Sequence, residues 1–390
     1  MAWKVESVSE IKKQFVLLFQ TGKFTMVELC KKFSISRPTG YGILNRYEEE
    51  GFSAFEERSK RHLHHPLQTS EKIEKAILSE RTRHPRWGAK KIRVLLERAM
   101  PDEKLPSETT VNNILKKNGM VTPRKKRRRQ IIPQFPVFDP ELPNEIWSAD
   151  FKGKFRMGNG EYCNPLTIAD SKSRYLLEIK GLEYCRAENC KPVFEKVFRE
   201  YGLPQMLHTD NGPPFGSAVS LRRMTTLSVW LMDLGILPVY SDPGKPQQNG
   251  RHERMHRDLK AEVTRPPGKS WRSQQKKFDD FRNEYNEIRP HEALGMKTPF
   301  EIHTRSKREY PSRIEEWAYP KEMKQKIVTV NGALRWNKDG LIMVSSALTG
   351  RYVGLECIED GVWLVYYRDF PLGILSERTK RVYELEEYQL

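Results

Sequence analysis

The segments WSADFKGKF (147–155), LPQMLHTDNGPPF (203–215) and KPQQNGRHERMHRDLK (245–260) decide the fold of this chain. Asp150 lies inside an expected strand, Asp210 follows a short apolar run at the end of another, and Glu253 lies in the first turns of an expected helix. Three carboxylates on two strands and a helix can hold two Mg²⁺ ions about 4 Å apart for an in-line phosphoryl transfer, with Mn²⁺ as a possible substitute. The chain has 51 acidic residues, so the sequence contexts carry this prediction more than the carboxylates alone.

The order of the secondary-structure signals predicts a mixed α/β domain over residues 144–305. Short apolar runs indicate strands, and longer stretches with helical periodicity indicate helices. The expected strands lie at 147–154, 162–169, 174–179, 205–208 and 236–240, and the expected helices at 188–201, 217–234 and 247–263. A hairpin run followed by alternating helices and strands is typical of a mixed sheet.

Other charged residues of this domain could also belong to the proposed metal site or lie beside it. The rival carboxylates are Asp170, Asp233, Asp242 and Glu262. Asp170 is typical of a turn between two strands, and Glu262 lies about 180° around the helix from Glu253, which excludes it from the site. Arg257 and Lys260 share the helical face of Glu253, where they either hold the phosphates of a DNA end or form a solvated surface.

Residues 1–60 predict a helix-turn-helix DNA-binding domain. Three helices are expected between residues 6 and 51; the second opens at a capping box of Thr25 and Glu28, and the third ends at Gly51. Two short helices joined by a tight turn can place the second one in a major groove. The residues that would then face DNA are Ser36, Arg37, Thr39 and Arg46. The alternative is a three-helix packing unit without groove contact.

Residues 68–122 predict a second helix-turn-helix module. Ser70 and Ser107 are expected to cap two of its helices, and Gly119 to end the last. Thr109 and Asn112 are its candidate DNA contacts. Tandem modules suit the reading of a long DNA repeat, because one recognition helix covers only a few base pairs.

A basic, proline-rich linker is expected at 123–143. Its six consecutive cations are Arg124, Lys125, Lys126, Arg127, Arg128 and Arg129. Such a run cannot form a core, and the prolines that follow favour an extended chain. The segment either follows DNA phosphates or a minor groove, or is a nuclear-localisation signal; the motifs on both sides favour the DNA role.

Residues 325–390 predict a small β-barrel domain. The pairs at 331–332, 339–340 and 360–361 are hairpin-type turns that separate β-rich runs. Such a domain would either contact DNA or another protomer, or serve as a structural cap.

Composition restricts the partners. With 68 basic and 51 acidic residues, the net charge of +17 implies a polyanion, either nucleic acid or an anionic membrane surface. No apolar run approaches the roughly 18 residues that span a bilayer, and no signal-peptide pattern is present, so nucleic acid is favoured. Five cysteines without a CxxC pair fit a reducing compartment.

Three motifs carry a resemblance to a known family. The segments WSAD (147–150), TDNG (209–212) and GRHER (250–254) resemble the catalytic motifs of DDE transposases and retroviral integrases, and YNEIRPHEALG (285–295) resembles the close of the core in bacterial insertion-sequence transposases. The interval from Asp210 to Glu253 is longer than in retroviral integrases. Their N-terminal zinc module is also unmatched, because only Cys30 precedes Cys163 and His62, His64 and His65 read as a solvated linker. The absence of the zinc module favours an insertion-sequence transposase.

The resemblance implies a ribonuclease-H-like core with Asp150 and Asp210 on adjacent central strands and Glu253 reaching them from a helix. It implies a transposase that binds the terminal inverted repeats of a mobile element, cleaves at its ends and joins the 3′ ends to target DNA by two-metal chemistry. We expect partners of double-stranded DNA and at least one further copy of the chain, no membrane, and a cytoplasmic, nucleoid-associated location in a bacterium. The rival hypotheses are a domesticated DNA-binding regulator without catalysis and a metal-dependent nuclease of the same fold.

Overall fold

The computed structural model describes residues 7–56, 68–121, 139–151, 153–217, 220–241, 250–336 and 340–385. The chain divides into two compact units, Met1–Glu71 and Lys72–Leu390. None of the helices in these described stretches combines the length and apolarity needed to span a bilayer.

The first unit is a three-helix domain, as predicted. Its elements are α1 (Val8–Gln20), α2 (Met26–Lys32), α3 (Arg37–Glu50) and the 3₁₀ helix Gly51–Phe55. The predicted capping box of Thr25 and Glu28 is present, and Gly51 ends α3 at φ +62°. Phe15 and Leu29 lie at the centre of the core. Gly40 lets α3 pack closely on α2, because a Cβ there would lie 2.8 Å from the Cys30 sulfur.

The second helical module opens the second unit. It consists of α4 (Glu71–Arg83), α5 (Ala89–Ala99) and α6 (Glu108–Lys117), packed around Trp87 and Ile92. Ser107 caps α6 as predicted, accepting a hydrogen bond from the Thr110 amide. Polar contacts tie this module to the rest of the unit: His84 lies 3.0 Å from Glu284, and Arg98 lies 3.1 Å from Glu301.

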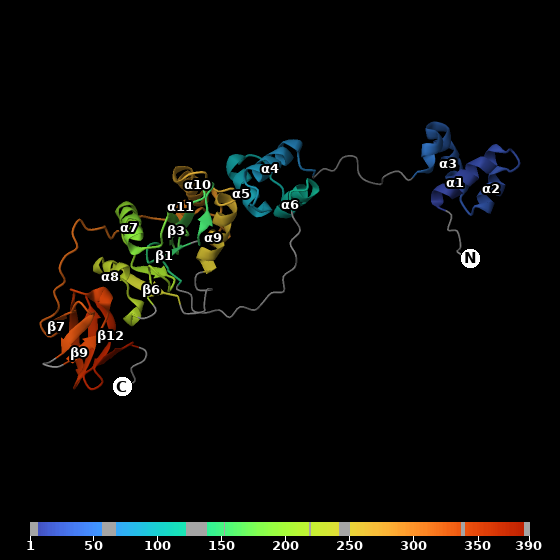
Figure 1. Cartoon of the computed structure of the whole chain (residues 1–390). Helices are drawn as coiled ribbons and strands as arrows, with labels where there is room; N and C mark the ends of the chain where they lie inside the picture. The colour runs from blue at the N-terminus through green and yellow to red at the C-terminus, as the bar shows by residue number, and fades with distance from the viewer. Residues whose placement is uncertain are drawn as a thin grey trace. The chain divides into compact units, whose positions relative to one another are not determined.

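A mixed sheet forms the centre of the second unit (Figure 1). Its strands are β1 (Ile146–Phe151), β2 (Phe155–Arg156), β3 (Tyr162–Asp170), β4 (Leu176–Leu182), β5 (Met206–Thr209) and β6 (Leu237–Tyr240). The order is β2-β3-β1-β5-β6, with β4 also pairing with β3. The β1–β3 and β3–β4 pairs are antiparallel, whereas β1–β5 and β5–β6 are parallel. The WSAD motif therefore lies on β1 and the TDNG motif begins at the end of the adjacent strand β5, in the centre of the sheet, as the resemblance implied.

Helices cover both faces of this sheet. The helices that position the site are α7 (Ala187–Tyr201), α8 (Thr226–Asp233), α9 (Gly250–Val263) and α10 (Trp271–Asn283). Trp147 and Ala149 of β1 pack with α7 and α8, whereas α9 and α10 share a second core with Ile179 of β4. Because strand side chains alternate between faces, Ser148 and Asp150 lie on the face covered by α9. After α10 the chain continues through the π-helix Glu284–Ile288, the 3₁₀ helix Glu292–Leu294 and α11 (Pro299–Ile302).

Two helix predictions in the core were wrong. The expected helix at 217–234 begins only at Thr226, because the Thr225–Ser228 capping box starts it there. Only a 3₁₀ turn, Leu221–Arg223, precedes it, and Arg222 and Arg223 have left-handed backbones at φ +47° and +55°. The polar sequence of α10 was not assigned at all, although Ser270 caps it and it buries Phe278 and Phe281.

The C-terminal region is β-rich, as predicted, but a closed barrel is not confirmed. Its strands are β7 (Lys324–Ile327), β8 (Ala333–Trp336), β9 (Gly340–Met343), β10 (Tyr352–Glu359), β11 (Val362–Tyr367), β12 (Phe370–Ser376) and β13 (Arg381–Tyr383). Five form an open sheet, β13-β12-β11-β10-β7, and β8 pairs with β9 in a separate hairpin. The sheet shares a core with Val229 and Met232 of α8, so α8 is buried between two sheets.

Candidate active site

Asp150 and Asp210 lie at the same edge of the sheet. The parallel pairing of β1 with β5 places Ser148 opposite His208. Asp150 follows two residues later within β1, and Asp210 follows two residues later, directly after the end of β5. Neighbouring strands lie about 4.8 Å apart, so the two aspartates start from neighbouring backbone positions at the same end of the two strands. The Asp150 side chain is one-fifth exposed, at 20%, and Asp210 is exposed, so both can meet a ligand from solvent.

Glu253 lies on the exposed face of α9. The same face carries Arg257 and Lys260, both exposed, as helical spacing predicted. The opposite side of α9 is buried, with Met255 and Leu259 in the core. Glu253 is therefore solvent-accessible on a helix that packs against the face of β1 from which Asp150 points.

A buried polar network joins α9 to the strands beneath it. The Thr167 hydroxyl lies 2.7 Å from Nε2 of His252 and 2.7 Å from Nε2 of His256. It donates to the Asp150 carbonyl oxygen at 3.0 Å. Nδ1 of His252 lies 2.8 Å from the Ser148 hydroxyl, and Nδ1 of His256 lies 3.6 Å from a carboxylate oxygen of Asp150. Sequence reasoning missed these residues, although two histidines four positions apart beside Glu253 were a visible signal.

The loop that carries Asp210 is tied to its neighbours. The Asn211 side chain donates to the Ser241 carbonyl at 2.6 Å and accepts from the Arg223 guanidinium. Although Asp210 is exposed on one side, desolvation by neighbouring atoms raises the pKa of its carboxyl group, and the Gly212 amide, 3.3 Å from the carboxylate, opposes the shift. The loop is therefore held before any ligand binds.

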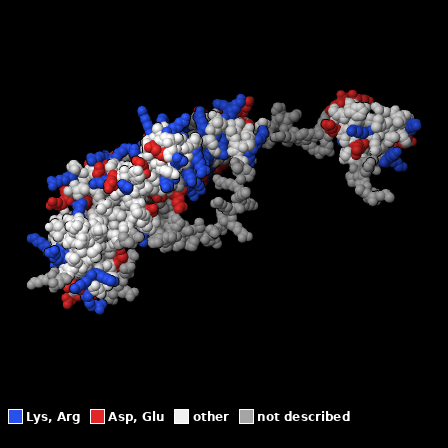
Figure 2. Space-filling model, in the orientation of Figure 1, with Lys and Arg blue, Asp and Glu red and all other residues white. Residues whose placement is uncertain are grey.

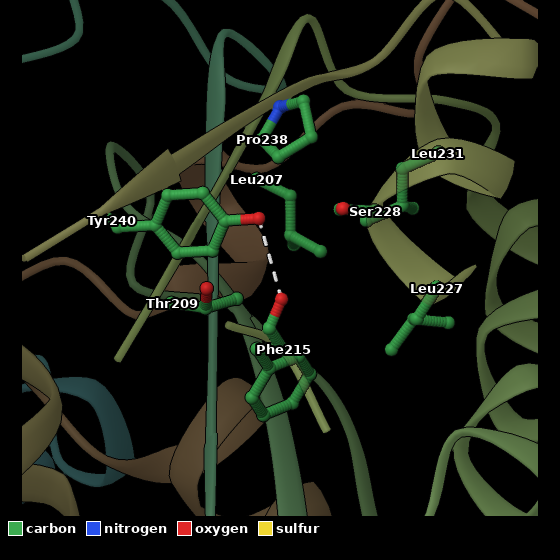
Figure 3. A pocket seen from close by; sticks show the side chains of 8 residues that line it. All are labelled: Leu207, Thr209, Phe215, Leu227, Ser228, Leu231, Pro238 and Tyr240. Atoms are coloured by element: carbon green, nitrogen blue, oxygen red, sulfur yellow. Dashed lines mark hydrogen bonds between the residues drawn. The ribbon is translucent and has the colours of Figure 1, made fainter. Parts of the chain in front are cut away.

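A narrow recess behind this loop is packing and not a reaction site. The Tyr240 hydroxyl donates to the Phe215 carbonyl at 3.3 Å across it (Figure 3). The recess is lined by Leu207, Thr209, Phe215, Leu227, Ser228, Leu231, Pro238 and Tyr240. These side chains are mainly apolar, so they support the end of β5 from which the Asp210 loop departs.

The rival carboxylates have structural partners. Asp170 is buried and accepts from the Asn144 amide at 2.8 Å and the Ser173 amide at 2.7 Å, which confirms its turn role. Asp233 is buried against the C-terminal sheet, and Glu262 lies 3.8 Å from Arg86 of the second helical module. Asp242 lies outside the described residues.

The candidate DNA contacts of the helical modules stand mostly at helix starts. Ser36 caps α3 and accepts from the Thr39 amide at 3.3 Å, while Arg37 and Thr39 are exposed. Arg46 is engaged locally, 3.0 Å from Glu50. In the other module, α6 carries the exposed Thr109 and the half-buried Asn112.

Several predicted features cannot be placed. The cations Arg124 to Arg129 and the histidines His62, His64 and His65 lie outside the described residues.

Basic side chains are dense over the part of the second unit that carries α5, α9 and α10, whereas the surface around α8 and β6 is mostly uncharged (Figure 2). This distribution fits a polyanion that contacts the side of the sheet covered by α9.

Sequence comparisons agree with this architecture. Residues 140–246 and 234–299 match the family models of the integrase core domain, residues 39–115 match a homeodomain-like domain, and residues 11–61 match a helix-turn-helix domain. The chain is 25% identical over 225 residues to the insertion element IS407 uncharacterized 31.7 kDa protein of Burkholderia multivorans, a match that covers 56% of this chain and 75% of that protein. It is 23% identical over 241 residues to the insertion element IS476 uncharacterized 39.2 kDa protein of Xanthomonas euvesicatoria, covering 61% of this chain and 66% of that protein.

Among solved structures, the catalytic core domain of HTLV-2 integrase in complex with magnesium is 17% identical, covers 42% of this chain and 99% of that chain, and superposes with a TM-score of 0.33. The two integrase core matches and the two insertion-element relatives bear directly on family. On these grounds, the chain belongs to the retroviral-integrase (rve) superfamily as an insertion-sequence transposase.

Proposed function

We propose that this protein is a DDE transposase that binds the terminal inverted repeats of its element, cleaves phosphodiester bonds at the element ends and joins the 3′ ends to target DNA. The observation that supports the proposal is the arrangement of Asp150 and Asp210 at one edge of the sheet, beneath the helix that carries Glu253. Asp150 lies on β1 and Asp210 directly follows the adjacent parallel strand β5. Glu253 lies on α9, whose His252 and His256 contact Ser148 and Asp150 of β1.

The donor set of this site fits magnesium. Three carboxylates provide hard oxygen ligands, which Mg²⁺ and Mn²⁺ prefer. In the described part of the chain, no three potential ligands are close enough to hold an ion as they stand. The exposed side chain of Glu253 would therefore change its conformation, with α9 in place, to complete the ligand set that Asp150 and Asp210 begin. When bound, a pair of ions would activate the attacking oxygen and stabilise the leaving oxygen.

The chain's own residues would orient the DNA around these carboxylates. Arg257 and Lys260 share the exposed face of α9 with Glu253, so they would hold phosphates of the DNA end beside the site. The tethers of Asn211 keep the Asp210 loop in place while the strand is exchanged. Water would reach the site from the exposed side, because Asp210 and Glu253 both face solvent.

The helical modules would recognise the element ends. The start of α3, with Ser36, Arg37 and Thr39, and the start of α6, with Thr109 and Asn112, would face DNA. Arg46 would contribute less than its sequence position implied, because Glu50 and the Glu56 carbonyl occupy its guanidinium. The basic run at 124–129 would add sequence-independent phosphate contacts.

The metal-site proposal is tested by Asp150→Asn, Asp210→Asn and Glu253→Gln. Each substitution keeps the shape of the side chain but removes a charged ligand, so each should abolish cleavage and strand transfer in Mg²⁺ while DNA binding persists. Near-wild-type cleavage by one variant would remove that residue from the site. Specific DNA binding by a wild-type protein that does not cleave its own element ends would instead favour the domesticated regulator.

The active form is proposed to be a homo-oligomer of at least two copies on two DNA ends. One site of this kind acts on one strand at a time, whereas transposition joins two ends to the target in concert. Light scattering of the protein with end DNA should show at least two protomers with two duplexes. A single protomer that completes joining of both ends would contradict this assembly.

A further inference from the structure

Two histidines of α9, His252 and His256, are buried at positions where apolar side chains could also fill the core. His252 and His256 each keep 3% of their surface exposed, and their ring centroids lie 4.6 Å apart. Met255 and Leu259 of the same helix show that apolar side chains fill the neighbouring core. A buried imidazole is costly unless its nitrogens are hydrogen-bonded, so the partners of these rings define their role.

The Thr167 hydroxyl is the shared partner of both rings. A hydroxyl has one proton to donate and two lone pairs that accept. With its proton directed to the Asp150 carbonyl, it accepts from Nε2 of His252 and from Nε2 of His256, each at 2.7 Å. This hydrogen-bond pattern places a proton on Nε2 of both rings. Nδ1 of His252 lies 2.8 Å from the Ser148 hydroxyl, which also donates to the Ala169 carbonyl at 3.4 Å.

The network contacts both the main chain and the side chain of Asp150, the first of the proposed metal ligands. Thr167 lies directly opposite Asp150 in the β1–β3 pair, and it bonds the Asp150 main chain while His256 lies 3.6 Å from the Asp150 side chain. Glu253 lies between the two histidines in sequence. With 3.6 residues per turn, His252 and His256 share one helical face, and Glu253 projects beside that face.

We propose that Ser148, Thr167, His252 and His256 are positioning residues that fix the rotation of α9, so that Glu253 and Asp150 meet the same metal ions. A rotation of α9 that carried Glu253 away would break the hydrogen bonds of both imidazoles to Thr167. This inference rests on the proposed two-metal function, because it assigns the network a role in assembling that ligand set.

The test is Thr167→Val in the full-length protein. Valine keeps the shape and the strand preference of threonine but removes the oxygen that joins the two rings. The matched variant Thr167→Ser restores the hydroxyl, and Ile168→Val, on the other face of β3, provides a stability control. Three quantities are measured: kcat and KM for cleavage of end DNA in Mg²⁺, Mn²⁺ affinity of the DNA-free protein by electron paramagnetic resonance, and Tm.

We expect Thr167→Val to lower kcat by about tenfold to a hundredfold, as a misplaced catalytic group does. Mn²⁺ affinity should fall with kcat, whereas KM for DNA should stay within about twofold because Arg257 and Lys260 are untouched. Thr167→Ser should recover most of the lost kcat and Mn²⁺ affinity. Ile168→Val should lower Tm without changing either.

If Thr167→Val has the same kcat and Mn²⁺ affinity as Thr167→Ser, the hydroxyl has no positioning role and the network contributes only to packing. That result would overturn this inference but leave the proposed function intact. A wild type that neither cleaves end DNA nor binds Mn²⁺ would refute the proposed function itself. If Thr167→Val does not fold, Ser148→Ala, which removes the bond to His252 and a longer bond to the Ala169 carbonyl, is measured in its place. A several-fold loss of kcat at unchanged KM supports the inference, and unchanged kcat and Mn²⁺ affinity overturn it.

Discussion

Replacement of Asp233 by alanine should release the C-terminal sheet from the catalytic core. Asp233 ends α8, and its carboxylate is 1% exposed. One of its oxygens accepts from the Tyr367 hydroxyl at 2.5 Å and from Nε of Arg368 at 3.1 Å. The other oxygen lies 2.9 Å from the Arg351 guanidinium but has no hydrogen-bond partner, so the Arg351 contact is an ion pair of poor geometry.

The size of the effect follows from how much of each partner is buried. Removing one member of a buried pair costs about 3–5 kcal/mol, because the remaining charge stays desolvated. Arg368 is 13% exposed and would be left in that state, whereas Arg351 is 49% exposed and can return to water. Asp233→Ala should therefore cost about 3–5 kcal/mol, and Arg351→Ala at most about 1 kcal/mol.

Hydrogen exchange of the β11 and β12 amides measures this difference in the full-length protein. Where closing is faster than exchange, the protection factor reports the free energy of local opening. At about 1.36 kcal/mol per decade, Asp233→Ala should lower protection by about two to four orders of magnitude, and Arg351→Ala by less than about one. A loss below tenfold for Asp233→Ala, or equal losses for both variants, would refute the reasoning.

Three further outcomes are expected. Affinity for end DNA should fall by orders of magnitude between about 50 and 200 mM salt, and a flat profile in filter binding would exclude multiple phosphate contacts. Arg37→Ala should weaken binding to end DNA more than to random DNA, whereas neutralising residues 127–129 should weaken both equally; equal losses for Arg37→Ala would remove it as a base reader. Burial, reinforced by Arg289, lowers the pKa of Lys91 to about 8, so stability should rise between about pH 8 and pH 10, where the folded state has released a proton that the unfolded chain retains. Lys91→Met should raise Tm at about pH 7 and remove that rise, and an unchanged pH dependence of Tm would contradict the assignment.

Local signals in the sequence predicted much of the secondary structure. The Thr25 capping box, the Ser107 cap and the Gly51 stop act within one helical turn, so they could be recognised without knowledge of the fold. The ends of the strand that carries Asp150 and of the strand that precedes Asp210 were placed within three residues. Such signals are short-ranged, and tertiary contacts do not override them here.

Where the local signals were weak, the tertiary structure decided. The expected helix at 217–234 lost its first half because the left-handed Arg222 and Arg223 turn is held by the C-terminal region, where the Arg222 guanidinium donates to the Pro371 carbonyl. The polar α10 was missed because only a few of its positions are apolar, and their burial depends on the β4 face that they cover.

The sequence by itself determined the acidic residues, their places in a strand, after a strand and in a helix, and the net positive charge, because residue type, periodicity and charge are properties of the chain alone. Only the tertiary structure decided that Thr167 would join two histidines beneath Asp150 and that Asp233 would lock α8 to the C-terminal sheet. Those contacts join residues far apart in the sequence. Their hydrogen-bond partners are set by strand pairing and helix rotation, and local sequence patterns do not encode either.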